Sequence, residues 1–140
     1  MKIEKLKYED LEMYKNLIDE SFGWSNDIES YKKYDDNSDV YQIIVSKVND
    51  KIVGSITFYN INLFTFSFQP CLEIFNVCVS KKYRRQGIAK ELFDYIFNYA
   101  RNNGYKQIYL TCLDNDISSH KFYESIDFKR MNSIKYSMNL

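Results

Sequence analysis

The sequence lacks the features that mark a membrane-bound or secreted protein. It has no apolar run long enough to cross a bilayer, no secretory leader pattern and no lipidation motif. Neither charge is in excess, because 19 lysines and arginines balance 19 aspartates and glutamates, so no overall field favours a nucleic acid or a membrane surface. We therefore expect a soluble cytoplasmic protein, mature as written, with no nucleic-acid partner and no membrane partner.

Paired cysteines and internal repeats are also missing. Cys71, Cys78 and Cys112 are odd in number and show no C-x-x-C spacing, and two of the three lie within apolar, strand-like segments. We interpret them as reduced core thiols, and we expect no metal site. The chain has no linker and is 45% hydrophobic over 140 residues, which is enough for one domain with a sizeable core and too little for two. We expect a single domain over residues 1–140.

Along the sequence, segments with the apolar spacing of strands alternate with segments that have the apolar spacing of helices. The clearest case is an apolar strand at residues 72–79 followed by a helix from residue 88 that Gly104 ends. The order of elements predicts an α/β fold with a mixed sheet. The expected elements are a strand at 3–6, helices at 9–22 and 27–34, strands at 41–48 and 51–60, an alternating aromatic segment at 61–68, the strand at 72–79, the helix from 88, a strand at 107–113, a short helix at 119–125 and a final strand at 134–139.

A basic turn at residues 84–89, with the sequence RRQGIA, joins the central strand to the central helix. A helix N-terminus presents unpaired backbone N–H groups at the positive end of its dipole, which suits a pyrophosphate. Gly87 lets that backbone approach a ligand closely. Residues 81–90 hold five cations and no acidic residue, which complements a polyanion. The alternative is a solvated basic turn whose glycine merely starts a helix.

Two motifs in this order resemble the GNAT superfamily of acetyl-CoA-dependent N-acetyltransferases. The turn at residues 84–89 matches the family's Arg/Gln-x-x-Gly-x-Gly/Ala pyrophosphate loop, with Ala89 an accepted variant. Residues 119–128 resemble the late Ala-His-Arg-Phe-Tyr-Glu-x-x-Gly-Phe motif, although Asp127 stands where glycine is usual. The resemblance covers residues 40–130. It implies a mixed, mostly antiparallel central sheet flanked by about four helices.

The resemblance also implies catalytic roles. An amine at pH 7 is mostly ammonium, so acyl transfer from a thioester needs a base, a donor for the oxyanion and an acid for the thiolate. The base would be Glu73, acting directly or through water, and the acid would be Tyr123. The plainer alternatives are a strand-end carboxylate paired with a lysine and an aromatic ring on the buried face of a short helix.

Acetyl-CoA is the implied co-substrate. Backbone groups of the central strand would pair with its pantetheine arm, the Val79 amide would steady the oxyanion, and the basic turn would hold the pyrophosphate. The predicted cofactor contacts are Val77, Cys78, Val79, Arg84, Arg85, Gln86, Gly87, Ile88, Ala89, Lys90, Asn115 and Phe122.

The acceptor pocket is implied to lie among the first two helices, their loop and the aromatic strands. The predicted substrate-binding residues are Phe22, Trp24 and Tyr59. Further aromatic and acidic residues in this region suit a small cationic primary amine, although a solvated acidic surface over an aromatic core is an equal alternative. These residues are Tyr31, Tyr34, Phe64, Phe66, Phe68, Asp35, Asp36 and Asp39.

Other functions stay open at this point. The chain could acetylate a protein lysine or N-terminus, or it could bind acyl-CoA as a sensing module without turnover. A thiol hydrolase would pair Cys78 or Cys112 with His120, but these cysteines lie in apolar strands without an evident activating helix terminus. We expect a monomer or a homodimer.

Overall fold

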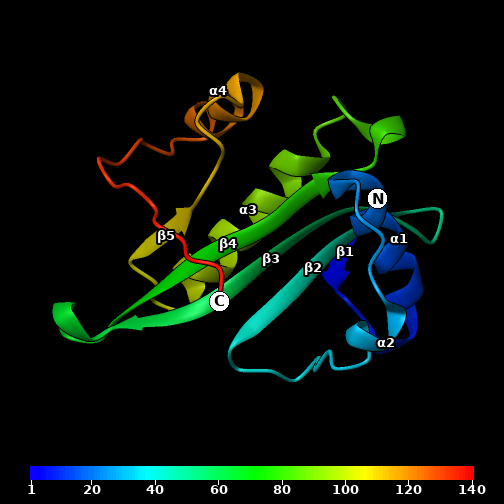
Figure 1. Ribbon diagram of the computed structural model, residues 1–140, viewed down its shortest axis with the longest axis horizontal. Coiled ribbons are helices and arrows are strands. Elements are labelled where there is room, and N and C mark those ends of the chain that lie inside the picture. The colour runs from blue at the N-terminus through cyan, green and yellow to red at the C-terminus, as the bar shows by residue number, and fades with distance from the viewer.

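The computed structural model describes residues 1–140, apart from the side chain of Phe66. Its centre is one twisted sheet with the strand order β1-β2-β3-β4-β5 (Figure 1). The strands are β1 (Lys2–Lys5), β2 (Tyr41–Val48), β3 (Lys51–Leu63), β4 (Gln69–Val79) and β5 (Gln107–Leu110). The helices are α1 (Leu11–Phe22), α2 (Ile28–Tyr31), α3 (Ile88–Asn102) and α4 (Ile117–Ser125). Short 3-10 turns lie at Tyr8–Asp10, Phe64–Phe66 and Lys81–Tyr83.

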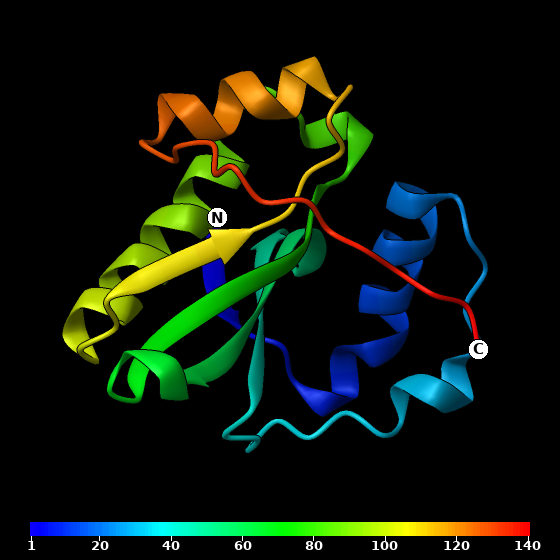
Figure 2. The same ribbon diagram turned by 60° about the vertical axis from the view of Figure 1, so that its left-hand side comes forward.

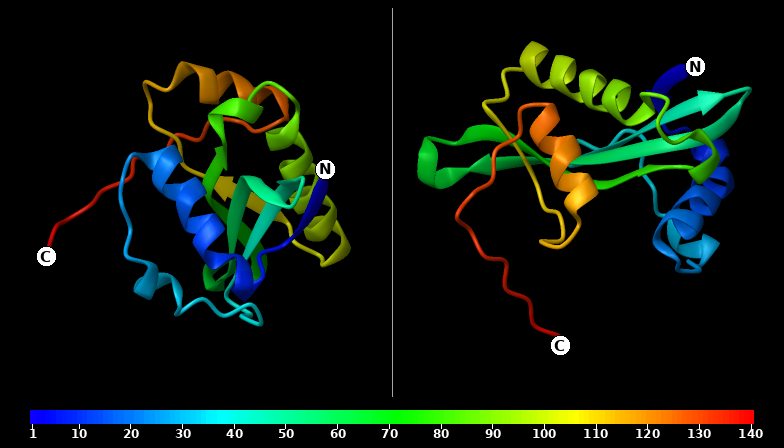
Figure 3. Two further views of the ribbon diagram at one scale, coloured as in Figure 1. Left: turned by 90° about the vertical axis from the view of Figure 1, so that its right-hand side faces the viewer. Right: turned by 90° about the horizontal axis from the view of Figure 1, so that it is seen from above.

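The sheet is mixed, as predicted. β1 to β4 pair antiparallel, and β4 pairs with β5 in parallel. α3 covers one face of the sheet, while α1 and α2 cover part of the other (Figure 3). The expected α/β class with about four helices is confirmed.

The main core lies between α3 and the sheet. Leu92, Phe93 and Ile96 are fully buried on α3, and they lie on one face because they recur at helical spacing. Gly54 on β3 lets the start of this helix approach, since a Cβ there would meet the Ile88 side chain at 2.9 Å. Close packing at this point fixes where the turn between β4 and α3 stands.

β4 contains a bulge just before that turn. Ser55 of β3 is paired with Cys78, and two positions along β3 Thr57 is paired with Phe75. Two residues, 76 and 77, lie between these β4 partners where only residue 56 lies between the β3 partners, so residues 76 and 77 share one place in the ladder. Asn76 adopts a left-handed conformation with φ of 54°, as the extra residue of a bulge often does. The bulge turns the main chain of β4 out of its regular pairing.

The pairing between β4 and β5 ends close to the same place. Their parallel ladder joins Cys71 to Gln107 and ends where Ile74 meets Leu110. Beyond it, β4 continues to Val79 with β3 as its described neighbour, while the chain after β5 leads away to α4 (Figure 2). The second half of β4 therefore offers backbone groups on an open edge.

Several expected boundaries shift. β3 runs on to Leu63 and a 3-10 turn follows, so the alternating segment at 61–68 is a strand end and a turn. Pro70 belongs to β4, where its carbonyl accepts the Lys106 N–H at 3.1 Å. The second helix is shorter than 27–34 and the fifth strand ends at Leu110. The short helix expected at 119–125 starts earlier, at Ile117.

The predicted final strand at 134–139 is wrong. Residues 131–140 are irregular and leave the body of the fold (Figure 3), and Ile134 and Tyr136 are 79% and 88% exposed. Alternating apolar residues favour a strand only where an edge pairs with them, and in the described chain nothing pairs with this tail. No helix among the described residues is both long and apolar enough to span a bilayer.

Candidate functional site

The turn before α3 is shaped by two residues with positive φ. Arg85 has φ of 61° and Gly87 has φ of 81°. A Cβ at Gly87 would meet nothing within 4 Å, so backbone conformation rather than crowding favours glycine there. Gly87 is also the N-cap of α3, and it has no side chain to cap the first turn. The first N–H groups of the helix are thus available to an anion.

Side chains in this turn are fixed by local contacts. The Arg84 Nε donates to the Val79 carbonyl at 3.2 Å, which closes the turn over the end of β4. Lys90 pairs with Asp94 one helical turn on, at 2.9 Å, with both side chains exposed. Part of the basic charge expected for a polyanion is therefore balanced within α3.

α4 is packed against the start of α3 by aromatic contacts. Asp116 caps α4 by accepting the Ser119 N–H at 3.2 Å. The ring of Phe93 meets those of Phe122 and Tyr123 with centroids 5.7 and 5.8 Å apart. The predicted cofactor contact Phe122 and the predicted acid Tyr123 thus stand on a helix held to the element that follows the basic turn.

Burial raises the pKa of Tyr123 to about 12, with smaller contributions from Cys112 and Asp116. The phenol consequently keeps its proton at every physiological pH. The raised pKa keeps the proton on the phenol, but it also makes the phenol a weaker acid than an ordinary tyrosine, so the shift by itself does not favour the predicted acid role.

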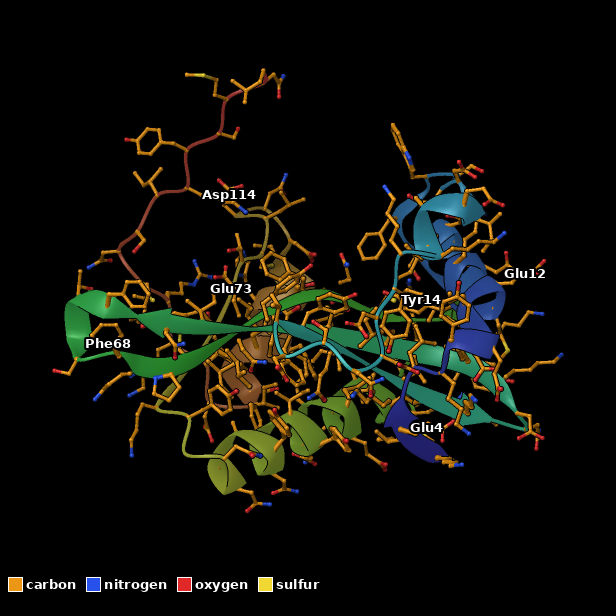
Figure 4. The ribbon with its side chains drawn as sticks, turned by 90° about the horizontal axis from the view of Figure 1, so that it is seen from below. Glu4, Glu12, Tyr14, Phe68, Glu73 and Asp114 are labelled. Carbon is orange, nitrogen blue, oxygen red and sulfur yellow. The ribbon has the colours of Figure 1, made fainter. Side chains whose placement is uncertain are left out.

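Glu73 lies in the middle of β4, on the face of the sheet away from α3. Its cross-strand neighbours are Tyr59 on β3 and Tyr109 on β5. Figure 4 shows Glu73 on the same side of the sheet as the loop that carries Asp114. The side chain is half-buried, and it precedes the bulge by three residues. A carboxylate is therefore held beside the open segment of β4.

The remaining predicted residues are scattered. Asn115 lies in the exposed turn that leads into α4. Phe22 ends α1 and is 51% exposed, and Trp24 follows it and is 70% exposed. Among the described aromatic contacts none joins either ring to Tyr59, whose contacts are with Tyr41 and Phe75. The aromatic segment residue Phe66 has its side chain outside the described part of the structure.

Sequence reasoning missed two rings near Glu73. Tyr41 and Phe75 contact opposite sides of Tyr59, with centroids 5.7 and 5.3 Å away. The alternation of residues along each strand predicts which face of the sheet Tyr41 and Phe75 occupy. Only the register between the strands shows that both rings contact Tyr59.

The cysteines do not form a hydrolytic centre. Burial raises the pKa of Cys78 to about 11, and it also raises the pKa values of Cys71 and Cys112. A higher pKa lowers the thiolate fraction that a nucleophile needs. His120 lies 3.0 Å from the Asp114 carbonyl oxygen through Nε2. The structure gives these groups structural roles, which argues against a thiol hydrolase.

A large hollow in the described structure lies outside this site. It has a volume of about 820 Å³ and runs between α3, β5 and the chain after α4. Phe97, Ile108 and Phe128 supply its apolar lining, and neither Glu73 nor Tyr59 contributes to it.

Comparison with known proteins identifies the family of the chain. Residues 11–128 match the model of the acetyltransferase (GNAT) family. N-acetyltransferase 8 and N-acetyltransferase 8B, both from Homo sapiens, are 30% and 29% identical to this chain over 86 residues. That stretch covers 61% of this chain and 37% of each relative. The match therefore spans little more than a third of the length of these curated relatives.

Solved structures share the fold over nearly the whole chain. An aminoglycoside acetyltransferase from an uncultured soil metagenomic sample, in complex with sisomicin, has a TM-score of 0.84 at 24% identity, covering 99% of this chain and 95% of that one. A ribosomal-protein-alanine N-acetyltransferase from Brucella melitensis biovar Abortus 2308 has a TM-score of 0.83 at 18% identity, covering all of both chains. The fold is that of an acetyltransferase. On the family match, this chain belongs to the acetyltransferase (GNAT) family, and the resemblance inferred from its two motifs is confirmed.

Proposed function

We propose that this chain is a single-domain, acetyl-CoA-dependent N-acetyltransferase that moves the acetyl group to a primary amine by direct attack on the thioester. We further propose that the acceptor is a small cationic amine and that the enzyme works in the cytoplasm, in line with its free cysteines. The observation that supports the proposal is that Val77 and Val79 of β4 pack against the same core as Phe122 and Tyr123 of α4, next to the turn that begins α3. Three separate segments contribute the proposed site. These are the glycine turn, α4 with its protonated tyrosine, and the strand position of Glu73.

The residues present suit acetyl-CoA. The free edge of β4 at Val77 and Val79 can pair with an extended amide-containing arm, as a sheet edge pairs with a peptide. Arg85 and Gly87, both with positive φ, give the following backbone the curvature of an anion cradle. When bound, acetyl-CoA supplies an activated acetyl thioester.

The protein groups would then divide the proton transfers. Glu73 would take a proton from the acceptor ammonium, directly or through one water, so that a neutral amine attacks. The Val79 N–H would donate to the developing oxyanion. As the C–S bond breaks, Tyr123 would give its proton to the departing thiolate, and it would be reprotonated by the second proton that the attacking nitrogen loses when it becomes an amide.

The proposal is tested by release of free thiol from acetyl-CoA in the presence of polyamines, aminoglycosides, amino acids and lysine peptides, with calorimetry of acetyl-CoA binding alongside. Turnover with one amine class establishes the transferase and names its acceptor group. Tight binding without turnover on any amine supports the sensing module instead. Absence of acetyl-CoA binding contradicts the cradle and the activity together.

A further inference from the structure

Four aromatic side chains form a continuous row on the face of the sheet away from α3. Tyr34 follows α2, Tyr41 lies on β2, Tyr59 on β3 and Phe75 on β4. Successive ring centroids are 6.2, 5.7 and 5.3 Å apart, which are the separations of aromatic rings in contact. The row therefore crosses three strands without a break and ends on the strand that carries Glu73.

The row is both accessible and fixed in place. Its two rings on β3 and β4 are each 38% exposed. At the other end, the Tyr34 hydroxyl donates to the Leu6 carbonyl at 2.7 Å, and the Tyr41 hydroxyl accepts the Asp35 N–H at 2.9 Å. Because Tyr34 and Tyr41 are already held, a cation that binds the π faces of these two rings need not order them first.

Carboxylates flank the part of the row that runs from Tyr34 to Tyr59. Glu73 is the direct cross-strand neighbour of Tyr59. At the opposite end, burial raises the pKa of Tyr34 to about 12, and the nearby carboxylates of Asp36 and Asp35 contribute to this rise. An aromatic strip with an anion at each end repels anions and attracts a ligand with separated positive charges.

Resting on the acetyltransferase activity proposed above, we propose that the acceptor is a linear polyamine. Its reacting amine lies beside Glu73, its methylene chain lies along Tyr59 and Tyr41, and a second ammonium group lies at the acidic turn after Tyr34. Between Glu73 and the acidic turn the strip is one ring wide and two ring-to-ring steps long. A narrow, flexible chain can follow it from end to end, whereas a compact polycation can contact only one part of it.

The test measures kcat/KM for α,ω-diamines of increasing length beside monoamines of the same length. Each pair differs only in the distal ammonium. The diamine advantage should be small for short chains and should reach about 10-fold or more once the distal ammonium spans the row, because close pairing with a carboxylate and a ring contributes about that much. The double variant Asp35→Asn with Asp36→Asn should remove this advantage.

A matched pair of variants tests the row itself. Tyr59→Leu keeps an apolar side chain but removes a π face, and it should lower kcat/KM for long diamines by about 3- to 30-fold. The control is Tyr95→Leu, because Tyr95 lies on α3 and is 37% exposed. This variant should leave kcat/KM for long diamines unchanged. Equal losses from both variants would overturn the assignment of the row.

The failure of this inference can be told from the failure of the proposed function. If diamines and monoamines of every length react equally, in an enzyme that acetylates some amine, the polyamine inference is wrong and the transferase stands. If no amine is acetylated, the proposed function is wrong. Calorimetry of spermidine binding then tests separately whether the aromatic row binds a polyamine. Binding that Tyr59→Leu weakens then supports the row, and absence of binding overturns it.

Discussion

The rings of Phe93 on α3 and Tyr123 on α4 meet edge to face, with centroids 5.8 Å apart. This contact gives Tyr123 two separable parts. Its ring packs against the main core, together with Phe128 at 6.0 Å, while its hydroxyl carries a proton with a pKa raised to about 12. Packing and catalysis can therefore be tested apart at one residue.

Tyr123→Phe is expected to lower turnover by about 10- to 1,000-fold with little change in acetyl-CoA affinity, because the ring stays and only the proton donor is lost. Steady-state kinetics and calorimetry measure the two effects. Tyr95→Phe on α3 is the control, since it removes a hydroxyl from a ring outside the site. Unchanged turnover in Tyr123→Phe would remove the acid assignment.

Glu73→Gln is expected to lower kcat/KM by about 100- to 10,000-fold at pH 7, because general-base removal of a proton contributes about that much. The loss should shrink as the pH rises toward about 10, where the amine loses its proton unaided. A pH series of rates measures this. The control is Glu12→Gln, an exposed carboxylate on α1 (Figure 4). A loss of the same size at every pH would show that Glu73 does not act as a base.

The parts of this site that local sequence predicts are those that depend on local geometry. Gly87 predicts a turn, because glycine permits positive φ. The apolar residues from Ile88 to Ala100 predict an amphipathic helix, because apolar residues at helical spacing share a face. Both stand in the structure as predicted.

Features that depend on pairing between strands were not predictable in the same way. The bulge at Asn76 and the contact of Tyr41 with Tyr59 exist only in a particular register, and a register is set by the whole sheet. The tail shows the converse, because Ile134 and Tyr136 alternate as a strand would but have no pairing edge in the described structure. The turn and the helices of the site could be predicted from local sequence, whereas the position of Glu73 beside Tyr59 depends on the strand register.

Gly87→Val is expected to weaken acetyl-CoA binding by about 10-fold or more, because a β-branched residue resists φ of 81° and the cradle must change shape. Calorimetry of acetyl-CoA binding measures the effect. Gly104→Val is a matched control, since Gly104 has φ of 75° and also meets nothing within 4 Å, but lies after the far end of α3. Both variants should lose stability, and only Gly87→Val should lose affinity. Equal affinities would count against the cradle.

A charge network holds the edge of the sheet to the start of α1. The Lys47 Nζ lies 2.8 Å from Glu4 Oε1 and 2.6 Å from Asp10 Oδ2, and the Lys2 Nζ lies 2.9 Å from Glu4 Oε2. Hydrogen bonds from Lys47 and Lys2 lower the pKa of Glu4 to about 2. The side chains of Glu4 and Lys47 are 15% and 12% exposed, so solvent screens the network only in part.

From this network we predict how the free energy of unfolding changes as the pH falls. The folded pKa of Glu4 lies below its unfolded value of about 4.3, so the carboxylate stabilises the fold above that pH and ceases to do so as the pH falls toward 2. Glu4→Gln should therefore lower the free energy of unfolding by about 1 kcal/mol at pH 7, after allowance for screening, and by progressively less toward pH 2. Urea unfolding at both pH values measures this. Glu29→Gln, which breaks a mostly exposed pair with Lys32, should have little effect at either pH. A Glu4→Gln loss that persisted unchanged near pH 2 would mean that packing, and not charge, makes Glu4 stabilising.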